Sequence, residues 1–134
     1  MKPVIPSSQQ SYYDEWHYAP AFDANGFLFL SGATGYDPET DGYPEDIAEQ
    51  IRLAFESLAE VLTEAGLGFE HVVDMTTYHV GLQSQLETFA RIKDQFIKEP
   101  YPAWTAIGVS ELASAGAKIE IKLIARRHDN LDWQ

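Results

Sequence analysis

The chain contains no cysteine among its 134 residues. This absence excludes disulfide bonds, thiolate metal sites and a cysteine nucleophile, and it is consistent with a reducing compartment. Basic residues are also scarce: nine Lys and Arg stand against 21 Asp and Glu, which gives a formal net charge of −12. Because nucleic-acid binding depends on Lys and Arg replacing the counterions of the phosphates, this balance argues against a nucleic-acid partner.

The sequence has no long apolar run near its start. The first ten residues, MKPVIPSSQQ, hold no stretch long enough for a signal peptide or a membrane span. Hydrophobic residues still make up 45% of the chain and aromatic residues 13%, enough to form a core and to argue against disorder. We therefore expect one soluble, acidic, cytoplasmic domain over residues 1–134, with no membrane partner.

The hydrophobic pattern predicts the order strands, helix, strand, helix, strand, strand. The predicted strands cover residues 17–22, 27–31, 72–80, 103–109 and 119–126, and the predicted helices cover 46–65 and run from 84 to the proline at 100. Asn25 and Gly26 tolerate positive φ and predict a hairpin turn. The strand at 27–31 is continuously apolar, so we expect it to be buried on both faces. The first sixteen residues show no periodicity and are expected to lie across the surface.

Each predicted helix has an apolar stripe and recognisable ends. The stripe of the first helix consists of Ile47, Ile51, Ala54, Phe55, Leu58, Val61, Leu62 and Ala65, and its polar side of Glu49, Gln50, Arg52, Glu56, Glu60 and Glu64. Gly66 suits a left-handed C-terminal cap. In the second helix Ser84 and Glu87 have the spacing of a capping box, and Leu86 begins its apolar stripe. Two such helices can cover only one face of the sheet, which predicts an α+β fold.

The last predicted strand indicates what the uncovered face does. Its odd positions from 119 to 125 are apolar and suit packing under the helices, whereas Glu120, Lys122, Ile124 and Arg126 alternate on the other side. A face that is neither fully apolar nor fully polar is typical of an oligomer interface. We therefore expect a homo-oligomer rather than a monomer.

No motif in the sequence predicts a metal or a nucleotide. Residues 37–42 resemble the start of a calcium loop, but the twelfth position, which should be a bidentate Glu, is Ala48, so a plain turn is favoured. The four histidines lack HxxxH or HExxH spacing, and neither GxSxG, GxGxxG nor GxxxxGK[ST] is present. We expect no metal site and no nucleotide-binding site.

Three features carry chemistry, each with more than one interpretation. The loop from Gly32 to Gly35 follows a strand and either turns backbone N–H groups toward an anion or is a tight turn in which glycines relieve strain, the turn being favoured. Glu120 lies between two isoleucines and is a solvated edge residue, a functional carboxylate with a raised pKa, or the ion-pair partner of Lys122. Trp104 fits a core or interface position better than a ligand contact.

These pieces together resemble the RidA (YjgF) family. The resemblance rests on YAPA at 18–21, LSGATGYDP at 30–38, VVDMTTY at 72–78, YPA at 101–103 and IEI at 119–121, and it spans residues 17–127. The segment YPAWTAIGV at 101–109 is closest to the YjgH-like branch of that family. The order and spacing of these motifs are more specific than any one of them.

The resemblance implies a chorismate-mutase-like α+β fold with a mixed sheet and two helices on one face. It also implies a homotrimer with a central barrel and a small-molecule cleft at each subunit interface. The implied activity is the cofactor-free hydrolysis of enamines and imines to a ketone and ammonia. The implied catalytic residue is Glu120, and the implied substrate-binding residues are Tyr18, Ser31, Gly32, Ala33, Lys93, Trp104 and Thr105.

Trp104 departs from the family pattern, in which an arginine follows the Pro-Ala pair and binds the substrate carboxylate. A guanidinium offers two parallel charge-assisted hydrogen bonds to a carboxylate, whereas an indole offers one neutral N–H. This difference predicts an altered substrate range, with a flat, conjugated or cationic substrate over the tryptophan ring. The alternative function is a non-catalytic module that binds a metabolite or a protein. The family is also described as ribonucleases, which the net charge disfavours.

Overall fold

The computed structural model describes residues 1–128 and has a mixed sheet with the strand order β1-β2-β3-β7-β5-β6, with β4 paired to β7 beside this path. The strands are β1 (Lys2–Val4), β2 (Ala21–Ala24), β3 (Phe27–Leu30), β4 (Ala33–Thr34), β5 (Val72–His79), β6 (Ala103–Gly108) and β7 (Ile119–Arg126). The helices are α1 (Gln10–Trp16), α2 (Ile47–Glu64) and α3 (Leu82–Phe96), with 3-10 turns at Ser7–Gln9 and Phe69–His71. The predicted α+β class is confirmed.

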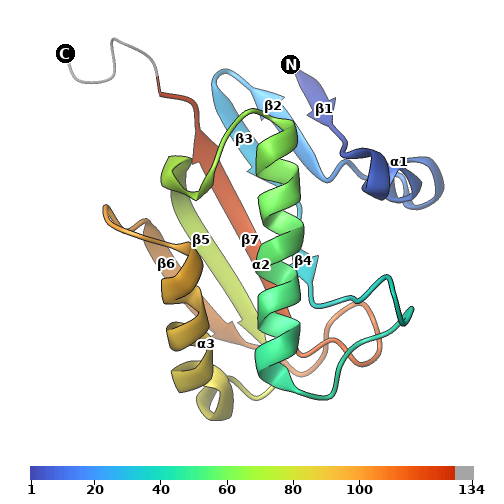
Figure 1. Cartoon of the computed structure of the whole chain (residues 1–134), viewed down its shortest axis with the longest axis vertical. Helices are drawn as coiled ribbons and strands as arrows, with labels where there is room; N and C mark the ends of the chain where they lie inside the picture. Colours follow the sequence, from blue (N-terminus) through green and yellow to red (C-terminus); the bar gives the residue numbers. More distant parts are fainter. Residues whose placement is uncertain (129–134) are drawn as a thin grey trace.

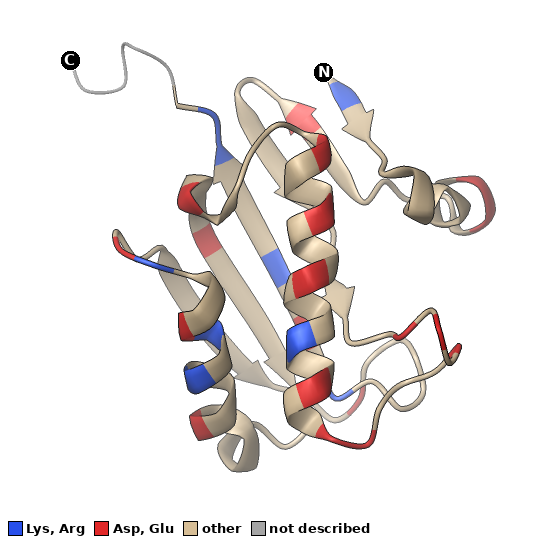
Figure 2. Cartoon of the chain, in the orientation of Figure 1, with Lys and Arg blue, Asp and Glu red and all other residues tan. Residues whose placement is uncertain are grey.

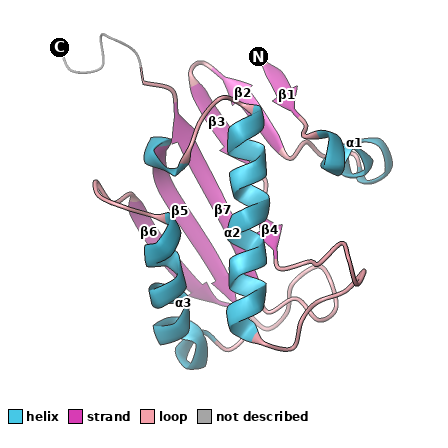
Figure 3. Ribbon diagram, viewed as in Figure 1, coloured by secondary structure: helices cyan, strands magenta, loops and turns pink. Residues whose placement is uncertain are grey.

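Helices α2 and α3 lie on the same face of the sheet and leave its other face uncovered by them (Figures 1 and 3). The predicted alternation of β7 is confirmed, because Ile119, Ile121, Leu123 and Ala125 are all completely buried. Phe55 of α2 lies at the centre of the core and stacks on Phe96, with ring centroids 4.9 Å apart. Burial of each such large side chain stabilises the fold by about 1.5–3 kcal/mol.

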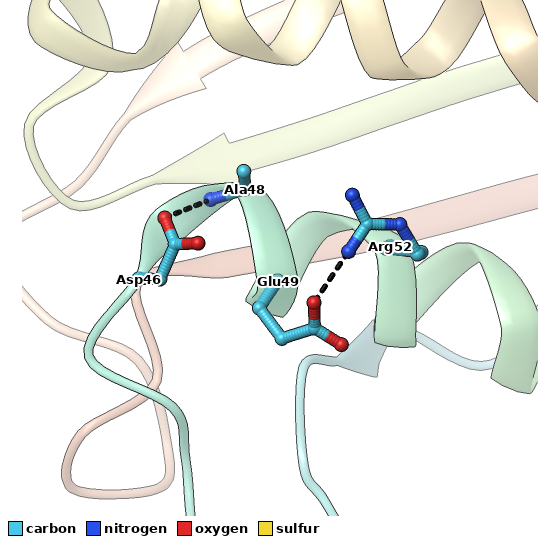
Figure 4. Close-up of polar contacts among 4 residues, drawn as sticks. All are labelled: Asp46, Ala48, Glu49 and Arg52. Carbon is cyan, nitrogen blue, oxygen red and sulfur yellow. Dashed lines mark hydrogen bonds and ion pairs between the residues drawn. The ribbon is translucent and has the colours of Figure 1, made fainter.

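Helix α2 begins and ends where the sequence indicates. The Asp46 side chain accepts a hydrogen bond from the backbone N–H of Ala48, 3.2 Å, and thus caps the helix (Figure 4). One turn later Glu49 and Arg52 form an ion pair on the helix surface (Figure 4). Gly66 has a φ of 76° and ends the helix in the left-handed conformation. Acidic residues recur along the length of α2 (Figure 2).

Gln50 is not on the polar side of α2, as its position in the helical pattern predicted, but is buried. Its side-chain amide donates to the carbonyls of Pro44 (2.7 Å) and Gly116 (3.0 Å), and its side-chain oxygen accepts from the N–H of Lys118, 2.9 Å. A buried polar side chain is tolerated where hydrogen bonds satisfy it. Gln50 therefore fastens the loop before β7 to the first turn of α2, a function that hydrophobic periodicity cannot reveal.

The hairpin between β2 and β3 is confirmed, since Asn25 and Gly26 have φ values of 57° and 83°. The prediction that the following strand is buried on both faces is wrong. Leu28 and Leu30 are completely buried, but Phe29 is 42% exposed. Phe29 lies on the face that α2 and α3 do not cover. This continuous apolar run is therefore a strand with one buried face and one exposed face that carries an aromatic residue.

The ends of α3 differ from the prediction. The helix begins at Leu82, directly after Gly81 in a left-handed conformation, and ends at Phe96. Ser84 therefore lies inside the first turn, where its hydroxyl donates to the Gly81 carbonyl at 2.9 Å, and the predicted capping box is wrong. Leu86 is 41% exposed and does not belong to the apolar stripe.

The first sixteen residues hold structure that the sequence pattern did not predict. β1 pairs antiparallel with β2, and helix α1 follows a short 3-10 turn. Over residues 37–42 the predicted plain turn is confirmed by paired backbone hydrogen bonds between Asp37 and Gly42. Within residues 1–128, the helices are too short or too polar to cross a lipid bilayer.

Candidate functional site

Glu120 lies on the open face of the sheet. Its two neighbours along β7 are buried under the helices, so the alternation of the strand directs the Glu120 side chain to the other side. Its partners across the sheet are Thr34 of β4 and Tyr78 of β5. Residues directly opposite in neighbouring strands share a face, so a hydroxyl-bearing side chain flanks the carboxylate on either side.

The carboxyl group of Glu120 lies against the backbone of Gly32. A β-carbon placed on Gly32 would be 2.7 Å from the Glu120 carboxyl carbon, too close for a real contact. Burial raises the pKa of Glu120, and the positive charge of Lys122 acts in the opposite direction. The Lys122 ammonium itself donates to the carbonyl of Leu30, 3.0 Å. The half-buried position argues against a fully solvated edge residue, and the functional role of the carboxylate stays a prediction.

Tyr18 belongs to the surroundings of Glu120. Its ring stacks on Tyr12 of α1, with centroids 5.7 Å apart and planes 11° apart. Burial raises the pKa of Tyr18, and the nearby Tyr12 and Glu120 raise it further. A carboxylate in the surroundings of the phenol disfavours the phenolate, so Tyr18 stays a neutral phenol.

Ser31 holds the segment that leads into this site. Its hydroxyl donates to the carbonyl of Ala19 at 2.6 Å, and its backbone N–H donates to Pro20 at 2.9 Å. Both bonds join the end of β3 to the residues directly after Tyr18. The Ser31 hydroxyl proton is thus committed to the backbone, and the residue fixes the position of its neighbours.

The interpretation of Gly32 to Gly35 as a strained turn is wrong. The glycines with positive φ among residues 1–128 are Gly26, Gly66, Gly81 and Gly116, and the segment instead contains strand β4. Gly32 leaves room for Glu120, and a β-carbon on Gly35 would be 2.5 Å from the α-carbon of Gln50. Close approach, rather than backbone strain, accounts for both glycines. Between them Ala33 pairs with Ile121 and packs against the core.

Trp104 and Lys93 lie on the helix-covered side. Trp104 pairs with the buried Met75 in the parallel register of β5 and β6, and its ring lies 5.6 Å from that of Phe89 in α3. The Lys93 ammonium is 5.2 Å from the Trp104 ring centroid and 2.9 Å from a carboxylate oxygen of Asp94. These residues form a second group between α3 and β6, the edge strand that α3 covers (Figure 1).

Thr105 points to the open face, since it pairs with Thr76, which in turn pairs with Lys122. Within one chain, therefore, Tyr18 and Gly32 lie near Glu120, and Thr105 shares its face. Ser31 is bonded to the segment after Tyr18, and Ala33 packs against the core. Lys93 and Trp104 are on the opposite face. The sequence pattern missed Tyr12, which stacks on Tyr18, because the segment before residue 17 lacks periodicity.

Two hollows in the surface lie elsewhere. One of about 450 Å³ is lined by residues of β1, the end of α2 and Arg127. The other, of about 310 Å³, is formed by Val80 and the loop at 110–118. Neither includes a predicted site residue.

Comparison with known proteins identifies the family of the chain and several of its relatives. The family model described as Endoribonuclease L-PSP matches residues 9–127. The RutC family protein YjgH of Escherichia coli is 41% identical over 125 residues, 92% of either chain, and Reactive Intermediate Deaminase A of Arabidopsis thaliana is 32% identical over 109 residues, 81% of this chain and 57% of that protein.

Solved structures show the same fold. A structure of YjgH superposes with a TM-score of 0.84 at 37% identity and covers 96% of this chain and 98% of its own. The structure of Escherichia coli TdcF with bound serine has a TM-score of 0.75 at 28% identity and covers 83% of this chain and 88% of its own.

Proposed function

Because the chain belongs to the Endoribonuclease L-PSP family, known also as the RidA or YjgF family, we propose that it is a cofactor-free deaminase. Its reaction is the hydrolysis of an enamine or imine to a ketone and ammonia. The observation that carries this proposal is the half-buried Glu120 carboxylate, with its raised pKa, against the Gly32 backbone. A carboxylate that binds and releases protons nearer neutrality suits proton transfer to and from water. The similarity to a reactive intermediate deaminase of Arabidopsis thaliana supports the same activity.

Glu120 acts as general base and then as general acid. It accepts a proton from the water whose oxygen attacks the C=N carbon of the protonated imine, which gives a neutral tetrahedral carbinolamine. It then delivers that proton to the nitrogen and takes up the proton of the carbinolamine hydroxyl, so that the C–N bond breaks and ammonia leaves as the C=O bond forms. Release of the second proton to solvent restores the carboxylate. The phenol of Tyr18 orients the reacting group beside the carboxylate, and the backbone at Gly32 and Ala33 borders it.

The placement of the site residues supports a homotrimer with the site between subunits. The Glu120 group and the Trp104 group lie on opposite faces of one chain, so one ligand contacts both only if a second subunit contributes one of them. The open face also exposes Phe22 (40%), Phe29 (42%) and Ile107 (38%), side chains that gain by burial against another copy. The serine bound to the relative TdcF supports a small ligand in the cleft.

Trp104 sets the substrate range. It stands where the family resemblance places an arginine, and it offers no guanidinium to a carboxylate. A flat, conjugated or cationic substrate gains from contact with the indole, whereas a small 2-imino acid loses its anchor.

Turnover of freshly generated 2-aminoacrylate by the wild type and by Trp104→Arg tests the function. We expect an inactive or slow wild type and an active variant, which would show that the Glu120 machinery is intact and that specificity has changed. Comparable wild-type turnover would contradict the substrate argument. A parallel screen of conjugated cyclic imines, with Glu120→Gln as control, tests catalysis itself.

A second candidate is a non-catalytic binding module, favoured by the absence of an arginine at Trp104. If neither the wild type nor Trp104→Arg turns over any imine, and Glu120→Gln binds small ligands as the wild type does, this module replaces the deaminase. The net charge of −12 argues against a ribonuclease that binds RNA directly. Strong binding of RNA at physiological salt would overturn that judgement.

A further inference from the structure

A chain of buried side chains runs beneath Trp104. The indole N–H of Trp104 donates to the hydroxyl oxygen of Thr77, 3.0 Å. That hydroxyl lies 2.7 Å from Nε2 of His79, and Nδ1 of His79 lies 3.0 Å from the side-chain oxygen of Gln85. Thr77 and His79 have no exposed surface, and Gln85 is 5% exposed. Trp104 itself is 37% exposed, so its polar edge points inward while part of its ring faces outward.

The direction of each hydrogen bond in this series of side chains follows from Gln85, the residue farthest from Trp104. The amide nitrogen of Gln85 donates both its hydrogens, to Val80 at 2.6 Å and to Lys118 at 3.1 Å, so its oxygen is an acceptor. His79 must then donate from Nδ1. Burial lowers the pKa of His79, which keeps the ring neutral and makes Nε2 an acceptor. Nε2 accepts the hydroxyl hydrogen of Thr77, and the oxygen of Thr77 is left to accept from Trp104.

We propose that Thr77, His79 and Gln85 are positioning residues that hold the indole N–H of Trp104 turned into the sheet. Trp104 then presents a ring edge and face to the ligand, and no hydrogen-bond donor. What the inference says about the substrate rests on the proposed function: the substrate has a planar, apolar group where it contacts Trp104. The orientation of the indole rests on geometry alone.

Packing around the indole supports this orientation. Phe89 lies against the Trp104 ring, with centroids 5.6 Å apart, and also against His79, with centroids 5.0 Å apart and planes nearly perpendicular. The Lys93 ammonium lies over the ring. A rotation of the indole that released its N–H to a ligand would leave a fully buried Thr77 oxygen without its donor, which costs free energy. The ring is thus fixed by contacts on its face and by a hydrogen bond at its edge.

Hydrogen–deuterium exchange of the indole N–H groups, followed by NMR, tests the orientation. The three tryptophans are assigned with Trp16→Phe and Trp133→Phe, and the exposed Trp16 is an internal reference. We expect slow exchange at Trp104 in the wild type. Thr77→Val, which keeps the shape but removes the hydroxyl, is expected to speed it roughly two- to tenfold, the net worth of one hydrogen bond. Thr77→Ser is expected to restore protection; equal exchange in all three proteins would overturn the proposal.

A measurement on the unaltered protein tests the hydrogen-bond direction. Side-chain ¹⁵N shifts are expected to show His79 as the neutral tautomer with its hydrogen on Nδ1. A hydrogen on Nε2 instead would overturn the assigned direction. His79→Leu is expected to speed exchange at Trp104 without changing Trp16, and an unchanged Trp104 would remove His79 from the positioning residues.

Kinetics separate this inference from the proposed function. On an imine that the wild type accepts, Thr77→Val is expected to raise KM more than it lowers kcat, and Thr77→Ser to reverse this. A protected Trp104 N–H in a protein that turns over no imine would contradict the deaminase and leave the positioning intact. A rapidly exchanging Trp104 N–H in a wild type that does turn over an imine would contradict the positioning and leave the deaminase intact.

Discussion

Glu120 packs so closely against the backbone of Gly32 that residue 32 has no room for a side chain. A β-carbon on Gly32 would lie 2.7 Å and 2.9 Å from the two outermost carbons of the glutamate side chain. The backbone of the segment after β3 therefore defines where the carboxylate sits. The charge of Glu120 raises the pKa of Tyr18, and the charge of Lys122 lowers the pKa of Glu120, so the position of the carboxylate affects its neighbours.

Gly32→Ala is expected to displace the Glu120 carboxylate and reduce kcat about tenfold to a hundredfold, because a shift of about 1 Å of a catalytic group has effects of this size. Gly42→Ala is the matched control: the nearest atom would be 3.9 Å from the new β-carbon. Steady-state kinetics of both variants decide the matter, and equal activities would show that the contact does not position the carboxylate.

Lys122→Met is expected to move the acid limb of the pH profile of kcat/KM to higher pH. The Lys122 charge lowers the pKa of Glu120 against the effect of burial, so its removal leaves only the upward shift. Lys98→Met, which removes an exposed charge bonded to a helix carbonyl, is the control. A limb that stays in place would mean that Glu120 is not the group that titrates.

Glu120→Gln is expected to unfold at higher denaturant concentration than the wild type near neutrality and at the same concentration in acid. A raised pKa in the folded state means that ionisation of Glu120 is less favourable in the folded than in the unfolded chain. The resulting penalty is absent below the ordinary pKa of glutamate and develops as the pH rises through the folded value. Denaturant titrations at the two pH values measure it. A less stable variant near neutrality would mean that the carboxylate is held by favourable contacts instead.

Phe55→Ala is expected to lower the free energy of unfolding by about 3–5 kcal/mol, because the side chain is completely buried and stacks on Phe96. Leu86→Ala, at a 41% exposed position of α3, is expected to cost far less. Urea unfolding gives both values. Similar losses would indicate that α3 packs more tightly than its exposure suggests.

Phe29→Lys is expected to convert an assembly of three times the 15.1 kDa chain mass into single chains, because it places a charge on the open face. Leu86→Lys is equally exposed but lies on a helix, and it is expected to leave the assembly intact. Native mass spectrometry distinguishes the species. A wild type that is monomeric from the outset would contradict the interface model of the site.

The fold could be predicted from the sequence in elements long enough to repeat the hydrophobic pattern of a strand or a helix several times. β7 alternates over eight residues and α2 keeps its stripe over five turns, so their buried faces matched the pattern. Short elements carry too few repeats, and α1 with seven residues and β1 with three were therefore missed. The burial of Phe29 was predicted wrongly because hydrophobicity alone does not distinguish a core position from an exposed apolar one.

The candidate site could be predicted only in part for a related reason. Glu120 stood out as a charge between isoleucines, but Gln50 and Gln85 are satisfied by groups far away in the sequence. Their burial depends on hydrogen bonds that form only once the chain is folded. The position of Trp104, across the sheet from Glu120, follows from the register of β5 and β6, which the strand pattern does not specify.

The strand order places the last segment of the sheet to be synthesised at its centre. β7 lies between β3 and β5, and it holds together two parts of the chain that have no direct ladder with each other. On the ribosome, the hairpin of β2 and β3 and the unit of β5, α3 and β6 therefore emerge before the strand that joins them. The sheet is completed, and Glu120 is set against Gly32, only after β7 has been synthesised, so this contact joins segments that are far apart in the sequence and forms late.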